Sequence, residues 1–119
     1  VRAGFTTVRD LGSARLTAFA LRDAIARGHV PGPRILASGP AVSIIGGHGD
    51  VNSFRPDVAQ ALDQGNTCTG PEQCAARVRE ASKRGADVIK ITATGGVLSQ
   101  QARGLGQHFT APEMQAIIA

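Results

Sequence analysis

The pattern of apolar and polar positions predicts strands and helices that alternate along the chain. The run "FTTVRDLG" is rich in β-branched residues and ends in a glycine turn, which predicts a strand near residues 5–9. A helix follows from Ala14 to Ile25, where apolar residues recur at helical spacing. Ser13 offers an N-cap for this helix, and Gly28 ends it.

The rest of the chain continues this order with longer connections. "PGPRILASG" predicts a second strand near residues 34–38, after a Pro/Gly turn. "ADVIKITATGG" predicts a third strand near 87–92, with the continuous apolar character of a parallel strand covered on both faces. The connections 40–70 and 97–109 are too long for ordinary turns, so we expect function there.

Two further helices are expected. Thr69 and Glu72 have the spacing of a capping box, although Gly70 followed by Pro71 is an equally good start. The packed face of this helix is expected to hold Cys74, Val78, Ala81 and Gly85. The last helix begins at "TAPE", and its inward face is expected to hold Met114, Ile117 and Ile118.

Alternating strands and helices favour an α/β fold with a parallel sheet and right-handed crossovers. With 119 residues the chain holds at most one domain. Three strands are few for such a sheet, and both outer strands would expose unpaired backbone. Val1 is not a start methionine. We therefore expect residues 1–119 to be an incomplete segment of a larger domain.

Composition narrows the class of protein. Hydrophobic residues make up 42% and charged residues 18%, within the range of globular proteins. No apolar run approaches the roughly 20 residues needed to cross a bilayer, and no secretory signal is recognisable, so we expect no membrane partner. The net charge is +4, but the arginines are scattered without aromatic residues between them, so nucleic acid is not expected as a partner. The compartment stays open, with the cytoplasm slightly favoured.

The two cysteines, Cys68 and Cys74, form neither a disulfide scaffold nor a zinc knuckle. A local bridge between them is one alternative. The favoured interpretation is a reduced pair, with Cys74 on a helix and Cys68 in a loop.

Candidate reactive groups follow the carboxyl ends of the predicted strands, where such folds place their sites. Asp10 follows the first strand and His48 the second. Lys90 lies near the end of the third strand, and His108 belongs to the loop after it. His29 follows a helix instead and should lie at the opposite face, so the three histidines do not form one cluster.

Two glycine-rich stretches lie in the long connections. "GGHGD" at 46–50 would let the backbone approach a ligand closely, or it is a flexible turn with an exposed histidine. "TGG" at 94–96 could form an amide nest for a carboxylate or phosphate. Neither G-x-x-x-x-G-K-[ST] nor G-x-G-x-x-G occurs, so a nucleotide site has little support.

Lys90 stands among Val88, Ile89 and Ile91, where an ammonium is costly unless it is paired or chemically changed. Three interpretations are open. The side chain reaches solvent, or it is an amine for Schiff-base chemistry. In the third, it carries carbon dioxide as a carbamate, an anionic oxygen ligand suited to bridging two divalent metals.

Five motifs together resemble the metal-dependent amidohydrolase superfamily, in the branch of imidazolonepropionase-like enzymes, Xaa-Pro dipeptidases and zinc carboxypeptidases. In chain order they are "GFTTVRDLG", "GPRILASG", "GGHGD", "GADVIKITATGGVLS" and "FTAPEMQAI". The resemblance implies a distorted TIM (β/α)8 barrel, of which this chain would hold a part, roughly barrel strands two to four. A closed barrel needs about 250 residues.

The resemblance also implies roles for particular residues. Lys90 would lie at the end of barrel strand four and, when carboxylated, bridge two zinc ions. His48 would contact the carboxylate or the scissile carbonyl of the substrate. The same pocket would be lined by Gly47, Thr94, Gly95 and Gly96. The implied reaction is attack of a metal-bound hydroxide on an amide bond, in dipeptides or N-acyl amino acids.

The other ligands of this family are missing. Its His-x-His pair would precede Val1, and two more histidines with a catalytic aspartate would follow Ala119. We therefore expect the isolated chain to be inactive, without zinc and with Lys90 as a free amine. The alternatives are a non-catalytic partial barrel and a lysine Schiff-base enzyme, with a small-anion binding module less favoured. A partial barrel would associate through open sheet edges, as a homo-oligomer or with the rest of the barrel.

Overall fold

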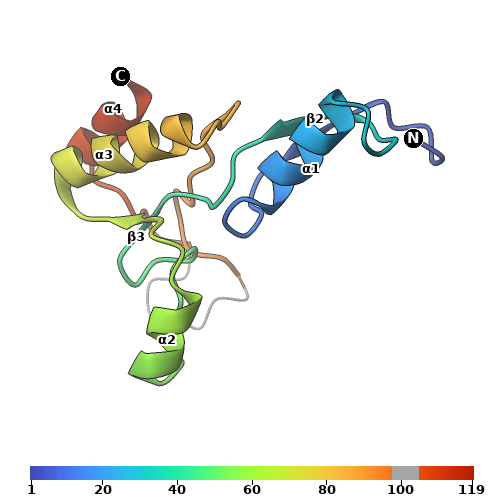
Figure 1. Cartoon of the computed structure of the whole chain (residues 1–119). Helices are drawn as coiled ribbons and strands as arrows, with labels where there is room; N and C mark the ends of the chain where they lie inside the picture. The colour runs from blue at the N-terminus through green and yellow to red at the C-terminus, as the bar shows by residue number, and fades with distance from the viewer. Residues whose placement is uncertain (98–104) are drawn as a thin grey trace.

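The computed structural model describes residues 1–97 and 105–119, which form short parallel strands and helices. In chain order these are β1 (Thr7–Asp10), α1 (Thr17–Ala26), β2 (Arg34–Ala37), β3 (Ser43–Ile44), α2 (Pro56–Leu62), β4 (Thr67–Cys68), α3 (Gly70–Lys83) and α4 (Ala111–Ile118). Figure 1 shows α1 beside β2 on one side, α3 beside α4 on the other, and α2 in a lower lobe. The mixture of parallel strands and helices agrees with the expected α/β class. The expected connection 97–109 lies partly outside the described residues.

The strands pair in two small parallel sheets. In the first, β1 pairs with β2, in a register that runs from Thr7 opposite Arg34 to Asp10 opposite Ala37. In the second, β3 pairs with β4 through Ser43 opposite Thr67. Because parallel neighbours share a direction, β1 and β2 end at the same edge, where Asp10 lies.

The prediction of a strand at residues 87–92 is wrong. The segment forms a single parallel bridge, between Ile91 and Val42, and belongs to none of the strands. Val88 is half-buried, and Ile89 is 37% exposed, so this stretch is not covered on both faces. Its apolar residues are typical of a sheet interior. A continuous strand also needs neighbouring strands to bond with, and the described residues supply only the single bridge at Val42.

The long connection 40–70 contains regular structure that the sequence pattern did not predict. It holds β3, β4 and the helix α2, which begins at Pro56 with Asp57 in its first turn. Proline at the start and an acidic residue in the first turn are ordinary helix signals. The helix buries none of its residues, which is why no apolar periodicity marked it.

Helix α1 begins later than expected. Ser13 does not cap it, and the Oγ of Ser13 is buried without a hydrogen-bond partner among the described residues. Arg15 has φ 44°, in the left-handed region, so the chain cannot be helical there. Leu21, one of the apolar residues whose helical spacing predicted this helix, is 50% exposed, and Phe19 is the buried residue of α1.

Helices α3 and α4 begin as two different signals predicted. Thr69 precedes α3 without capping it through its side chain, so the Gly70–Pro71 start is the one that applies. Thr110 and Glu113 form a capping box at "TAPE", where the last helix was expected to begin. In α4 Ile117 is buried, but Ile118, expected to face inward, is 77% exposed.

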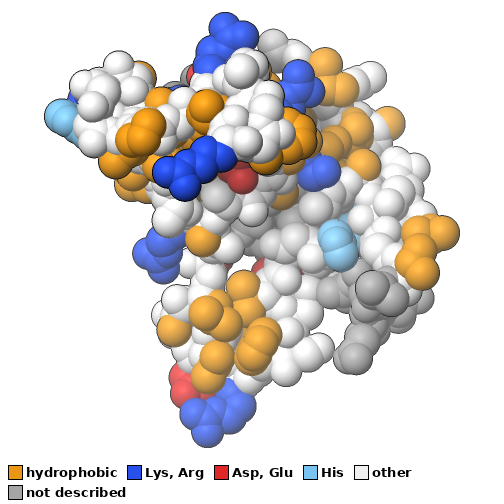
Figure 2. Space-filling model, turned by 90° about the vertical axis from the view of Figure 1, so that its right-hand side faces the viewer, with side chains coloured by type: hydrophobic (Ala, Val, Ile, Leu, Met, Phe, Trp, Pro, Cys, Tyr) orange, Lys and Arg blue, Asp and Glu red, His pale blue; other side chains and the backbone are white. Residues whose placement is uncertain are grey.

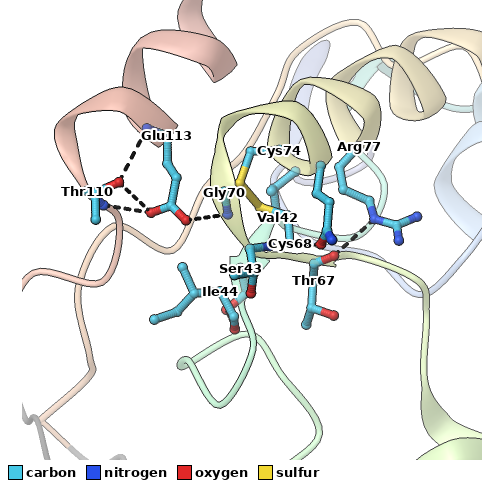
Figure 3. Close-up of a disulfide and its surroundings, with 12 residues drawn as sticks. Val42, Ser43, Ile44, Thr67, Cys68, Gly70, Cys74, Arg77, Thr110 and Glu113 are labelled. Carbon is cyan, nitrogen blue, oxygen red and sulfur yellow. Dashed lines mark hydrogen bonds between the residues drawn. A yellow bond between two sulfur atoms is a disulfide. The ribbon is translucent and has the colours of Figure 1, made fainter.

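Cys68 and Cys74 form a disulfide, so the expectation of reduced cysteines is wrong (Figure 3). β4 ends at Cys68, and α3 turns back so that the two Cα atoms lie 5.1 Å apart, within the range that a disulfide requires. Both cysteines are fully buried. They belong to the larger apolar cluster, which contains Val42, Cys68, Cys74, Phe109 and Ile117.

A second apolar cluster lies between α1 and the first sheet and contains Phe19, Ile35 and Ala37. No helix within residues 1–97 and 105–119 is both long enough and apolar enough to cross a membrane.

Candidate active site

The segment that carries Lys90 is fastened at its beginning by Asp87. The Asp87 Oδ2 accepts hydrogen bonds from the Ala37 N–H at 2.9 Å and from Arg22 Nη1 at 2.7 Å. The Asp87 N–H in turn donates to the Ala37 carbonyl at 2.8 Å. The Ala37 N–H and the Arg22 guanidinium lower the pKa of Asp87 below its ordinary value. The beginning of the Lys90 segment is therefore fixed to the end of β2 by hydrogen bonds between Asp87 and Ala37.

Lys90 is half-buried beside the short connection between β2 and β3. Its carbonyl accepts from the Val42 N–H at 2.8 Å, and the Thr92 N–H donates to the Val42 carbonyl at 3.0 Å. Between them, Ile91 packs into the larger apolar cluster. Because side chains alternate along extended backbone, Lys90 and Thr92 share the face opposite Ile91. Among the described residues, Lys90 forms no salt bridge.

His48 lies exposed in the turn 46–50, between two glycines with little room around them. A Cβ on Gly47 would stand 2.6 Å from the Ser43 Oγ and 2.9 Å from the Ile44 carbonyl. The Gly49 N–H donates to the Ser43 Oγ at 3.2 Å, and Asp50 Oδ2 accepts from the Gly46 N–H at 2.6 Å. These contacts favour a fixed turn over the flexible one that the sequence left open.

The His48 turn and the Lys90 segment are in contact. A Cβ on Gly49 would stand 3.3 Å from both Cγ2 and Oγ1 of Thr92. Since Thr92 shares its face with Lys90, the His48 turn packs against the face of the segment that carries Lys90. The structure thus brings together two of the segments that the sequence singled out.

Thr94 and Gly95, which follow the Lys90 segment, contact residues 106 and 107. Thr94 bridges Gln107 in antiparallel pairing, and the Gly95 N–H donates to the Gly106 carbonyl at 3.3 Å. The Thr94 hydroxyl donates to the Gly95 carbonyl at 3.0 Å. Since the Gly95 N–H is already engaged in this way, the arrangement is not an open amide nest of the kind considered from the sequence.

Of the remaining candidates, His108 lies beside the segment of Lys90, because its N–H donates to the Ala93 carbonyl at 2.9 Å. His108 is 6% exposed beside the buried Phe109, and its Nδ1 has no hydrogen-bond partner among the described residues. The Oδ2 of Asp10, at the end of β1, is buried and equally without a partner there. His29 is exposed just after α1. Among the described residues, the three histidines form no group that is placed to hold a metal ion.

The described residues offer one proposed metal ligand rather than a complete centre. No group of three His, Cys, Asp or Glu side chains among residues 1–97 and 105–119 is placed to hold a metal ion. A half-buried lysine that forms no ion pair with the described residues, on a segment beside a fixed turn, fits a carbamate ligand. Any metal centre built around Lys90 needs further ligands from outside these residues.

Comparison with known proteins gives the family. The amidohydrolase family matches residues 1–119, which is the whole chain. The chain belongs to the amidohydrolase family. Enzymes of this family generally use divalent metal ions, and the TIM-barrel type of α/β fold is implied for it.

Individual relatives agree with this assignment. An ochratoxinase from Aspergillus niger is 32% identical over 131 residues, which cover 97% of this chain and 26% of that protein. The crystal structure of a Xaa-Pro dipeptidase with methionine bound in its active site has a TM-score of 0.86 and 41% identity, over 98% of this chain and 29% of that one. The crystal structure of A. niger ochratoxinase has a TM-score of 0.81 and 30% identity, over 97% and 29% of the respective chains. The chain thus spans between a quarter and a third of the length of these relatives.

The side chains that shape the His48 turn were not found from the sequence. Ser43, Asn52 and Asn66 each bond to the backbone of residues 47–49. Polar residues in a glycine-rich connection look like solvated loop residues. Only the structure shows that these three point inward to the turn.

Proposed function

We propose that this chain is a central segment of a metal-dependent hydrolase that cleaves amide bonds in dipeptides or N-acyl amino acids. In this proposal the segment is part of a TIM barrel, with the Lys90 segment and the His48 turn at its active face. Family membership supports hydrolysis in general, and the dipeptidase and ochratoxinase relatives support substrates with an amide bond.

The observation that carries the proposal is the contact between Gly49 and Thr92. It supports a site in which the turn of His48 lies against the segment that carries Lys90. A ligating group and a substrate-contacting group must lie within reach of one substrate, and this packing fixes their segments together. Without that contact, nothing would indicate that the two motifs lie close together in space.

Lys90 as a carbamate would hold two divalent metals, zinc in our proposal, together with ligands outside the described residues. When bound, the metals would supply Lewis-acid activation of water and of the scissile carbonyl. The residues of this chain have the other tasks. His48 contacts the substrate carboxylate or carbonyl, and the pocket beside it is lined by Gly47, Thr94, Gly95 and Gly96.

The test replaces Lys90 in the full-length protein that contains this segment. Lys90→Met should lower kcat/KM for Xaa-Pro dipeptides and N-acyl amino acids about a thousandfold, or about 4 kcal/mol of transition-state stabilisation. Lys83→Met is the matched control, because Lys83 is the other lysine of the chain and is exposed at the end of α3. Full activity of the Lys90 variant would contradict the proposal.

A second readout does not depend on activity. After growth or exchange with ¹³C-labelled bicarbonate, the full-length protein with metal should show a carbamate carbon signal. The signal should be absent from Lys90→Met and present in Lys83→Met. A Schiff-base enzyme would behave differently, because borohydride would trap a carbonyl substrate on Lys90 and no carbamate would be found.

A further inference from the structure

The backbone on both sides of His48 is held by side chains from other parts of the connection 40–70. The Gly47 carbonyl accepts from Asn52 Nδ2 at 2.9 Å. The Gly49 N–H donates to the Ser43 Oγ at 3.2 Å, and the Gly49 carbonyl accepts from Asn66 Nδ2 at 3.0 Å. The peptide units that flank His48 are therefore fixed on both sides.

Asn66 makes the most far-reaching of these contacts. Its Nδ2 also donates to the Ala41 carbonyl at 2.6 Å, so both protons of one amide group bridge residues 41 and 49. Its backbone carbonyl accepts from the Ser43 N–H at 3.1 Å, where the pairing of β3 with β4 begins. Asn66 is half-buried, so these bonds have limited competition from water.

The same bridge reaches the Lys90 side of the site. Ala41 directly precedes Val42, whose N–H and carbonyl bond to Lys90 and Thr92. The Gly49 end of the bridge packs against the Thr92 side chain. Asn66 therefore lies at the point where the turn of His48 and the strand-like segment of Lys90 are joined.

We propose that Asn66 is a positioning residue, which fixes the turn 46–50 so that His48 is presented to the substrate in one direction. The structural part of this proposal stands on the hydrogen bonds alone. Its catalytic part rests on the role proposed above for His48. The chemistry required is a fork of two N–H donors facing two carbonyl oxygens, which asparagine provides at this length and an aspartate of the same shape does not.

The experiment compares Asn66→Asp and Asn66→Ala with the unaltered full-length protein. Asn66→Asp keeps the volume but removes both donors and turns carboxylate oxygens toward two carbonyls. Gln64→Ala is the matched control, because Gln64 also bonds from this segment to a backbone group, the Arg15 N–H at 3.1 Å, but not to the His48 turn.

The first readout is hydrogen–deuterium exchange of the peptide that covers residues 46–50, which needs no activity. Both Asn66 variants should exchange at least about tenfold faster there, while Gln64→Ala should leave this peptide unchanged. Unchanged exchange in folded Asn66→Asp would overturn the proposal, even if the enzyme were active. If neither Asn66 variant folds, Asn66→Ser, which retains a single donor, takes their place, and faster or unchanged exchange in it decides the proposal in the same way.

The second readout is a double-mutant cycle with His48→Ala, measured as kcat/KM. If Asn66 acts through His48, Asn66→Ala should lower kcat/KM about tenfold alone and cause no further loss in the His48→Ala background. Additive losses would show that Asn66 acts elsewhere and would overturn its positioning role. If the full-length protein hydrolyses no amide substrate, the proposed function fails, while the exchange result still decides whether Asn66 holds the turn.

Discussion

Glu113 shows how one carboxylate can join two helices. Its Oε2 accepts from the Thr110 N–H at 2.8 Å and from the Thr110 hydroxyl at 2.9 Å, closing the capping box of α4. Its Oε1 accepts from the Gly70 N–H at 2.7 Å, at the beginning of α3 (Figure 3). An anion placed against N–H groups at two helix starts is favourable. These bonds, first from Thr110 and then from Gly70, lower the pKa of Glu113.

Glu113→Gln should lower the free energy of unfolding by about 1–2 kcal/mol at neutral pH, because an amide cannot replace all three acceptor contacts. A lowered pKa means that the charged form stabilises the fold above the ordinary carboxyl pKa, and that this contribution is lost as the pH falls through the folded-state value. The difference between variant and unaltered chain should therefore be complete at pH values above the ordinary carboxyl pKa and decrease as the pH falls through the lower folded-state pKa. Urea unfolding across this range measures it.

Glu72→Gln is the control for this experiment, since Glu72 is exposed in the first turn of α3. It should change stability by a few tenths of a kcal/mol at most. If both variants lost the same free energy of unfolding, the negative charge near a helix start would account for the effect. The bonds by which Glu113 links α3 to α4 would then contribute nothing further.

His48 is argued to contact the substrate carboxylate, which gives a second prediction. In the full-length protein, His48→Ala should raise KM about tenfold or more for substrates with a free carboxylate, with a smaller change in kcat. Substrates whose carboxylate is blocked as an amide should bind equally weakly to both forms. His29→Ala is the control, because His29 is exposed after α1, away from the site. A fall in kcat with unchanged KM would place His48 at the scissile carbonyl instead.

At this scale the sequence points to candidates for unusual chemistry more readily than to the residues that support them. Lys90 stands out because it interrupts an apolar run, and His48 because glycines surround it. Asn66 has no such signal, since its partners lie 25 and 17 residues away and any polar side chain looks ordinary in a loop. Its role depends on proximity that only the folded chain creates.

At the scale of elements, the disulfide fastens the end of β4 to the first turns of α3. It lies beside the Glu113 contact at Gly70, so α3 is held at its beginning by a covalent bond and an ionic hydrogen bond (Figure 3). The sequence separation is 6 residues, so the bridge closes a small loop. Small loops gain less stability from a disulfide than large ones, but the gain is still appreciable.

Reduction should therefore lower the free energy of unfolding by about 2 kcal/mol. Urea unfolding with and without a phosphine reductant measures the change, and a double variant with Cys68→Ala and Cys74→Ala is the control that should not respond to reductant. Alkylation of the denatured, unreduced protein should leave its mass unchanged. Two alkylated thiols would contradict the disulfide directly.

Elements with local signals were predictable and elements that depend on distant neighbours were not. The start signal of α4 lies in four adjacent residues, "TAPE", and the helix begins there as expected. The segment 87–92 has the composition of a buried strand but forms one bridge, because strand pairing needs partners on its flanks. The disulfide was only the less favoured alternative for the same reason, since it requires two cysteines to approach after β4 and α3 have formed.

At the scale of the whole molecule, apolar side chains and strand edges remain uncovered within the described residues. Each sheet has two strands, and such small sheets are marginal by themselves. Large apolar side chains are exposed, among them Phe5 at 65% and Ile45 at 63%. Figure 2 shows apolar side chains gathered over the lower lobe, which carries α2 and contains the exposed Phe54 and Leu62. Surfaces of this kind are typical of contacts with other protein segments.

We expect the isolated 119-residue chain to self-associate through these surfaces. We also expect it to show no hydrolase activity, because its described residues supply only one proposed metal ligand. Sedimentation velocity should show an apparent mass that rises with concentration. Phe54→Lys together with Leu62→Lys should reduce this association, because two charges at the apolar patch oppose burial. The matched control, Arg55→Lys, preserves the charge at an exposed neighbouring position and should leave association unchanged.

The same surfaces give the proposal its strictest test at this scale. If the chain is a segment of a barrel, the remaining segments of the protein, supplied as a separate chain, should bind it, end its self-association and restore metal-dependent hydrolysis. Binding should fail with Phe54→Lys and Leu62→Lys only if the α2 lobe is part of that contact. A chain that stays monomeric alone over a wide concentration range would show that its exposed apolar residues need no partner, and the argument for a partial barrel would lose its support from the surface.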